Sequence, residues 1–162
     1  MNSQSTVVEK RKSGRPPENA KNELKLELPS LSVNEGIARS LVSVFVSQLD
    51  PTFEELSDLK CAVSEAVTNS IVHGYKNTVG PVYITLKILK ERTVKIEVRD
   101  KGCGISDVKT AMQPLFTTDP DGERSGMGFT VMESFTDKVT VVSRPDHGTK
   151  VTMIKTVEGV RR

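Results

Sequence analysis

Apolar and polar residues alternate twice in succession between positions 82 and 98, and this pattern constrains the fold more than any other feature of the chain. The two apolar runs are Val82, Ile84, Leu86 and Ile88, and then Val94, Ile96 and Val98. A period of two predicts half-buried strands, and the stretch "KER" between the runs predicts a hairpin turn. The chain therefore needs a sheet with one face packed on a core.

Three more strands are predicted around this hairpin. "ELKLEL" at 23–28 alternates leucines, and "KVTVVSR" and "TKVTMIK" flank a turn at "PDHG" near the end of the chain. Helical spacing of apolar residues predicts one helix after Ser32, a second from Thr52 to about Gly74, and a third after Gly128. The order predicts an α+β fold, a two-layer α/β sandwich whose mixed, mostly antiparallel sheet has helices on one face.

Capping boxes support the first two helices. Ser32 with Glu35, and Thr52 with Glu55, have the spacing at which a hydroxyl and a carboxylate satisfy the first free backbone N–H groups. In the first helix, the expected apolar spacing runs through Ile37, Leu41, Val44 and Phe45. In the second helix, the residues expected to face inward are Leu56, Leu59, Val63, Ala66, Val67 and Ser70.

The length and charge distribution predict one domain with extensions. The chain has 162 residues, of which 36% are hydrophobic, which suits a single core. Residues 1–22 hold five basic and two acidic side chains, leaving 18 basic and 19 acidic residues in the remainder. We expect residues 1–22 to be a disordered basic arm, 23–157 the domain, and 158–162 a C-terminal tail.

The arm contains "KRKSGRPP", which is similar to minor-groove hooks that insert an Arg–Pro core between A·T base edges. DNA contact is one interpretation. A solvated arm, or a start codon assigned too far upstream, is the alternative.

The rest of the composition indicates a cytoplasmic protein. Cys61 and Cys103 lack CxxC spacing, and no apolar run approaches the ~20 residues that span a bilayer. The N-terminus lacks the apolar segment of a secretory signal.

Polar residues gather at helical spacing on the second predicted helix. Glu65, Asn69 and His73 lie at i, i+4 and i+8, roughly opposite the inward stripe. A carboxylate can act as a base, and an amide oxygen can ligate a hard cation such as Mg²⁺. A solvated helix face is the alternative.

Three glycine-containing motifs follow. "DKGCG" (100–104) stands at a predicted strand end, "GMG" (126–128) opens a helix, and "GT" (148–149) lies in the last hairpin. Each alone is also typical of an ordinary turn. Residues 101–125 form a loop longer than the ~12–15 residues usual in compact domains, which favours a lid or binding loop.

Together, ExxxN, DxGxG, GxG and GT resemble the nucleotide site of the GHKL ATPase superfamily, which includes gyrase, Hsp90, MutL and histidine kinases. The stretches "VSEAVTNSIVHGY", "PLFTTDPDGERSGMGFTVMESF" and "ARSLVSVFVSQLDPT" resemble more closely the anti-sigma F factor family, ATP-dependent serine/threonine protein kinases of sporulating bacteria. The resemblance covers about residues 23–157 and implies a Bergerat-type ATP-binding fold.

The resemblance implies ATP and Mg²⁺ as cofactors and assigns roles to individual residues. Glu65 would be the catalytic base, Asn69 would bind ATP through Mg²⁺, and His73 would face the phosphates. Asp100 would accept a hydrogen bond from adenine, with Gly102, Gly104 and Thr149 beside the ring. The lid and phosphate contacts implied by the resemblance are Thr117, Thr118, Arg124, Ser125, Gly126, Met127 and Gly128.

The resemblance also implies partners. Members bind a sigma factor, here of the sigma F type, and phosphorylate an anti-anti-sigma protein on serine; Arg39 matches the position that touches both. They form homodimers, which apolar positions of the first helix and strand could support. A general-stress kinase of the sigma B type and a catalytically inactive ATP-dependent binding module are the alternatives, whereas histidine kinases and the larger GHKL ATPases do not match the chain's length.

Overall fold

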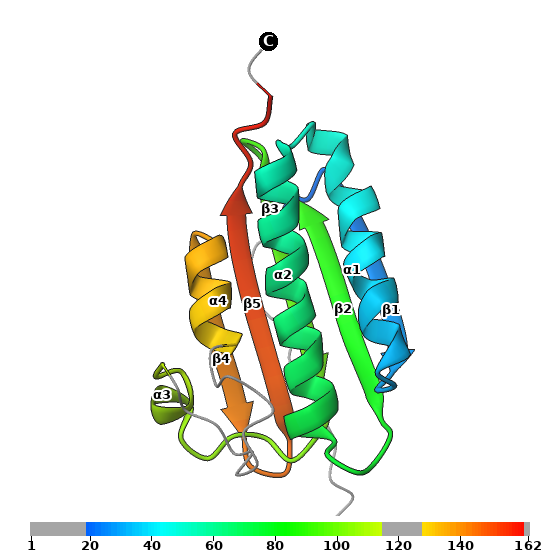
Figure 1. Cartoon of the computed structure of the whole chain (residues 1–162), viewed down its shortest axis with the longest axis vertical. Coiled ribbons are helices and arrows are strands. Elements are labelled where there is room, and N and C mark those ends of the chain that lie inside the picture. The colour runs from blue at the N-terminus through cyan, green and yellow to red at the C-terminus, as the bar shows by residue number, and fades with distance from the viewer. Residues whose placement is uncertain (1–18, 115–127, 161–162) are drawn as a thin grey trace, which may run out of the picture.

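A computed structural model describes residues 19–114 and 128–160 of the chain. Figure 1 shows its elements along the chain. In order they are β1 (Asn22–Pro29), α1 (Val33–Val46), η1 (Ser47–Leu49), α2 (Phe53–Asn69), η2 (Ser70–Gly74), β2 (Pro81–Ile88), β3 (Thr93–Asp100), α3 (Val108–Ala111), α4 (Gly128–Phe135), β4 (Lys138–Arg144) and β5 (Gly148–Thr156).

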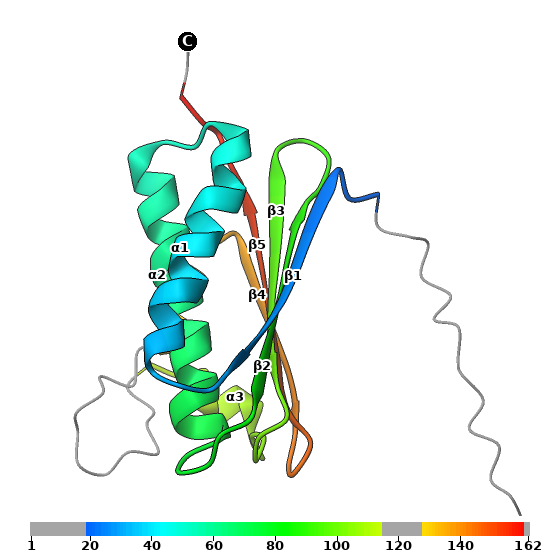
Figure 2. The same cartoon turned by 90° about the vertical axis from the view of Figure 1, so that its right-hand side faces the viewer.

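The strands form one five-stranded sheet in the order β1-β2-β3-β5-β4. Each of the four strand pairings is antiparallel, so the expected mixed sheet contains no parallel pair in the described residues. Helices α1 and α2 lie on one side of the sheet, with α4 beside α2 (Figures 1 and 2). The α+β fold, with two layers and helices on one face, is confirmed.

The core lies between these layers, where the alternation of β2 and β3 places it. All seven apolar residues of the two runs are at most 3% exposed. They pack against α2 through Leu59, Val63 and Val67, and against Met132 of α4. Burial of alternate strand residues on one helical layer is the main source of stability in such a sandwich.

The apolar spacing predicted for α1 coincides only in part with its buried face. Its buried face carries Ala38, Val42 and Phe45, whereas Ile37 is 45% and Val44 69% exposed. Apolar residues occur around most of this helix, so their spacing alone does not select the inward face. Val33, Ile37 and Val44 therefore form an exposed apolar stripe on the outside of α1.

The two predicted capping boxes have different outcomes. Thr52 and Glu55 form theirs reciprocally at the start of α2. Ser32 is the N-cap of α1 but makes no side-chain capping bond, so that prediction is wrong. The Glu35 carboxylate instead accepts a hydrogen bond from Ser64 of α2, a tertiary contact that competes with the local one.

The second helix changes geometry before it ends. Regular α-helix stops at Asn69, and Ser70–Gly74 form a π-helical turn in which the Tyr75 N–H donates to the Ser70 carbonyl at 3.0 Å. Single π turns are rare and occur frequently at functional sites. No helix in the described parts of the chain is long and apolar enough to cross a membrane.

Candidate functional site

Glu65 and Asn69 lie on one face at the C-terminal end of α2, and the start of α4 contacts them. Both are half-buried, which argues against a merely solvated face. A Cβ placed on Gly128 would stand 3.1 Å from Glu65 Oε2 and 3.3 Å from Asn69 Nδ2. The structure thus brings together two motifs that are 59 residues apart in sequence, and glycine permits the close approach.

His73 does not continue this face in the predicted way. After Asn69 the helix continues as a π turn, in which successive residues do not advance by the 100° of an α-helix. The i+8 spacing therefore no longer aligns His73 with Glu65 and Asn69. His73 is half-buried in that turn, and its carbonyl accepts a hydrogen bond from Cys103 Sγ at 3.1 Å. Its main chain therefore holds the loop that follows β3.

Asp100 is the most constrained polar residue of the site. It ends β3, is only 4% exposed, and accepts from three donors. Its Oδ2 accepts from Ser70 Oγ at 2.9 Å, and its Oδ1 accepts from the N–H groups of Gly102 at 2.9 Å and Thr149 at 3.3 Å. These bonds hold the carboxylate in one orientation between η2, the loop after β3, and β5.

Sequence reasoning missed the role of Ser70. The sequence pattern places Ser70 only in the inward apolar stripe, yet its hydroxyl is the side-chain donor to Asp100. A hydroxyl among otherwise apolar stripe positions, one residue after Asn69, was the available signal. A buried hydroxyl requires a partner, and here the partner is the acid of the next motif.

Tyr75 was missed as well. Its phenol donates to the Pro81 carbonyl at 2.5 Å and accepts from the Lys101 N–H at 2.8 Å. Burial is the main cause that raises the pKa of this phenol, and the nearby Asp100 carboxylate adds to it. Tyr75 therefore links the π turn, the start of β2 and the residue that follows Asp100.

The glycines after Asp100 have a packing reason of their own. A Cβ on Gly102 would come within 2.2 Å of the Gly74 carbonyl oxygen. Gly104 has φ +71°, and a Cβ there would come within 2.1 Å of the Arg144 carbonyl oxygen. Backbone therefore meets backbone at both positions, which only glycine allows.

Thr149 joins the site at the start of β5. Besides its N–H bond to Asp100, its hydroxyl lies 2.8 Å from Ser143 Oγ. Ser143 also accepts from the Ile105 N–H at 2.8 Å and donates to the Gly148 carbonyl at 3.0 Å. The last hairpin and the loop after β3 are thus connected by one serine, which the sequence motifs did not include.

The remaining predicted residues lie elsewhere. Arg39 is on α1, its side chain is 45% exposed, and its Nε stands 3.8 Å from Glu35 Oε1. It is outside the group around Asp100. The predicted lid residues Thr117, Thr118, Arg124, Ser125, Gly126 and Met127 lie outside the described residues.

The oxygen donors suit a hard cation held jointly with a ligand. Asn69 offers an amide oxygen, which is a ligand type that Mg²⁺ accepts. Within the described ranges, no group of three or more His, Cys, Asp or Glu side chains could hold a metal alone. A magnesium ion that keeps waters and is shared with phosphates needs only one or two protein ligands, so Asn69 fits this role.

Comparison with known proteins agrees with this geometry. A profile of the histidine kinase-like ATPase domain matches residues 28–155. The anti-sigma F factors of Bacillus velezensis and Bacillus anthracis are each 53% identical over 136 residues, which is 83% of this chain and 92% of theirs.

Solved structures share the fold at low identity. The RsbU and RsbW domains of Rv1364c from Mycobacterium tuberculosis give a TM-score of 0.62 at 16% identity, over 84% of this chain and 32% of that one. The histidine kinase domain of the Erythrobacter litoralis EL346 blue-light activated kinase gives 0.50 at 15% identity, over 76% and 61%. The chain belongs to the anti-sigma F factor family, within the histidine kinase-like ATPase domains of the GHKL superfamily.

Proposed function

We propose that this protein is a cytoplasmic anti-sigma factor that binds and inhibits a sigma factor of the F type, and a kinase that uses ATP to phosphorylate an anti-anti-sigma protein on serine. The observation that carries this proposal is the close approach of Gly128 to both Glu65 and Asn69. This approach brings together the proposed base, the proposed magnesium ligand and the glycine at the start of α4.

Each residue has a task that its position supports. Asp100, held by three donors, would accept a hydrogen bond from the exocyclic amino group of adenine, because a carboxylate has lone pairs to spare. Asn69 would hold Mg²⁺, and bound MgATP would supply the phosphoryl group with its charge partly neutralised. Glu65 would take the proton from the substrate serine hydroxyl.

Partner binding would use the outer face of α1. Arg39 is exposed there, and the side chains of Val33, Ile37 and Val44 are exposed on the same helix. Arginine is enriched at protein interfaces, which suits Arg39 for partner binding. At 100° per residue, Val33, Ile37 and Val44 lie roughly 120–160° around the helix from Arg39, so they form a separate apolar stripe. Homodimerisation through this stripe and the free edge of β1 is part of the same proposal.

Two substitutions on α2 test the proposal. Glu65→Gln keeps size and polarity but cannot accept the serine proton, so phosphate transfer to the anti-anti-sigma protein should fall by about 10²–10⁴-fold while ATP and sigma-factor binding persist. Asn69→Ala should lose magnesium-dependent ATP binding together with transfer. Glu54→Gln, at the far end of the same helix, is the matched control and should behave as wild type.

The measurements are ATP affinity with and without Mg²⁺, capture of the sigma factor, and transfer of labelled phosphate. Normal transfer by Glu65→Gln would remove its role as base. A wild-type protein that binds ATP and the sigma factor but transfers no phosphate would instead be an ATP-dependent binding module.

A further inference from the structure

One face of the sheet points away from α1 and α2 (Figure 2). By the strand registers, this face carries more cations than carboxylates. Its residues alternate with the buried ones along each strand. Its acidic residues are Glu23, Glu27 and Glu97. Its basic residues are Lys25, Lys87, Lys95, Arg99, Lys138, Arg144 and Lys150.

Two pairs of like charges stand directly opposite each other across neighbouring strands. Lys87 pairs with Lys95 between β2 and β3, and Arg99 pairs with Lys150 between β3 and β5. Like charges in this position are destabilising unless an anion lies between them. The two pairs can therefore be compared within one surface.

The first pair is compensated by the chain itself. Glu23 Oε2 lies 3.5 Å from Lys87 Nζ, and Glu97 Oε1 lies 3.6 Å from Lys95 Nζ. Arg99 and Lys150, in contrast, form no ion pair with any described residue. Their charges are left for an anion from outside the described chain.

Tyr83 gathers further positive charge at the same place. It stands opposite Arg99, whose Cζ lies 4.4 Å from the ring centroid, and Lys101 Nζ lies 5.3 Å from the same centroid. These cation–π contacts hold the cations over the ring. They also occupy the ring, so that it offers no open platform on which a nucleic acid base could stack.

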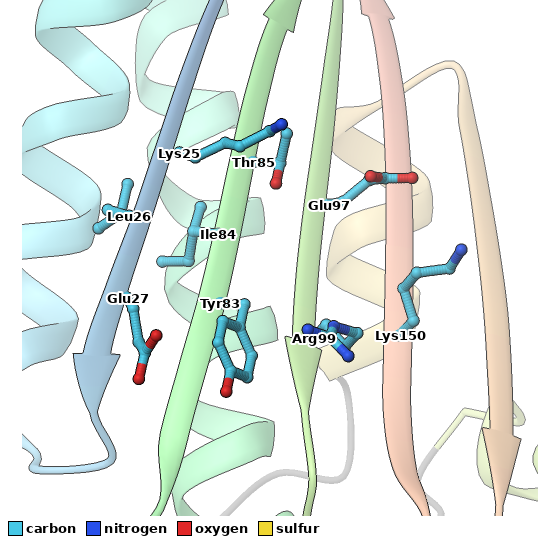
Figure 3. A pocket seen from close by; sticks show the side chains of 9 residues that line it. All are labelled: Lys25, Leu26, Glu27, Tyr83, Ile84, Thr85, Glu97, Arg99 and Lys150. Carbon is cyan, nitrogen blue, oxygen red and sulfur yellow. The ribbon is translucent and has the colours of Figure 1, made fainter. Parts of the chain in front are cut away.

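A hollow of about 360 Å³ runs over these residues (Figure 3). Its lining side chains come from β1, β2, β3 and β5, and include Glu27, Tyr83, Arg99 and Lys150. Four neighbouring strands span roughly 14 Å at ~4.8 Å each, which is the length of about four extended residues. The shape suits an elongated segment better than a compact small molecule.

We propose that Arg99 and Lys150 bind carboxylate side chains of an extended acidic segment of a partner protein. A second copy of this chain would present the same cations and be repelled. The inference does not depend on the kinase proposal, because these side chains lie on the opposite face from the candidate nucleotide site. Arg99 and Lys150 are nevertheless sequence neighbours of Asp100 and Thr149, so such a segment would bind behind that site.

The test uses the full chain without nucleotide and a fluorescein-labelled peptide of ten glutamates, followed by anisotropy at low salt. We expect saturable binding that Arg99→Glu and Lys150→Glu each weaken by about tenfold, because each exchanges an attraction for a repulsion. Lys138→Glu is the control, because it changes the net charge of the same face by the same amount. Lys138 lies opposite Ile154, which is four residues along β5 from Lys150. Lys138→Glu should weaken binding less than about threefold.

Equal losses in all three variants would overturn the proposal, since only the overall charge would then matter. Tighter binding of a ten-nucleotide oligothymidylate than of the peptide would also overturn it, in favour of nucleic acid. So would self-association in sedimentation velocity that Lys150→Glu abolishes. Independently, Lys150→Glu removes a like-charge pair, so its unfolding free energy should match or exceed that of wild type; a clear loss would contradict the argument.

Discussion

Replacing Ser70 by alanine tests how strongly the fold holds Asp100. Both residues are almost fully buried, with 4% exposure each, and their oxygens are 2.9 Å apart. A hydrogen bond to a carboxylate contributes about 1.5–3 kcal/mol, and its loss leaves that oxygen without its hydroxyl donor. The unfolding free energy of Ser70→Ala should therefore fall by about 1.5–3 kcal/mol, or roughly ten- to 150-fold in the unfolding equilibrium constant.

A double-mutant cycle isolates the pair. In an Asp100→Asn background, the Ser70 contact becomes one between neutral groups, which contributes only about 0.5–1.5 kcal/mol. Removing Ser70 should then cost about 1 kcal/mol less than in wild type. Ser40→Ala is the matched control, because this exposed serine bonds only the carbonyl of Gly36 in its own helix.

Urea unfolding followed by far-ultraviolet circular dichroism, without nucleotide, measures all four proteins and the control. The reasoning would be refuted if Ser70→Ala lowered stability no more than Ser40→Ala. It would also be refuted if the cost of losing Ser70 were the same with Asp100 and with asparagine at that position.

Three further predictions concern the site and its supports. Asp100→Asn should abolish most ATP binding in calorimetry while the protein stays folded, because an amide can present a donor where adenine needs an acceptor; unchanged affinity would remove Asp100 from the adenine site. Gly148→Ala should cost about 1–3 kcal/mol in urea unfolding, because φ is +86° and a Cβ would lie 2.1 Å from the Asp100 carbonyl oxygen, whereas Gly36→Ala, with nothing within 4 Å, should be neutral or stabilising. Burial raises the pKa of Glu55, but hydrogen bonds from the Thr52, Glu158 and Gly159 N–H groups outweigh it and lower the pKa below 4.5. The stabilisation of the folded state by ionised Glu55 should therefore be complete above about pH 4.5 and disappear as the pH falls through the folded-state pKa. The difference in unfolding free energy between wild type and Glu55→Gln should then shrink in acid, and a constant difference would contradict this.

The sequence alone was sufficient wherever a local pattern decided the structure. The alternation over 82–98 specified β2, β3 and their buried faces, because the side-chain period of a strand is two and one face must be covered. The Thr52–Glu55 capping box was predictable for the same reason, since both partners lie within one helical turn. The motifs around Glu65, Asp100 and Gly128 were visible as residues, though not as a group.

Only the tertiary structure decided how these pieces meet. Ile37 and Val44 had the periodicity of a core face, but α2 and the sheet accept Ala38 and Val42 instead, because packing chooses among the apolar faces of a helix. Glu35 left its local cap for Ser64, and the π turn at Ser70 placed a hydroxyl on Asp100, thirty residues away. Such contacts depend on the positions of two elements at once, and the periodicity of either element alone carries no information about them.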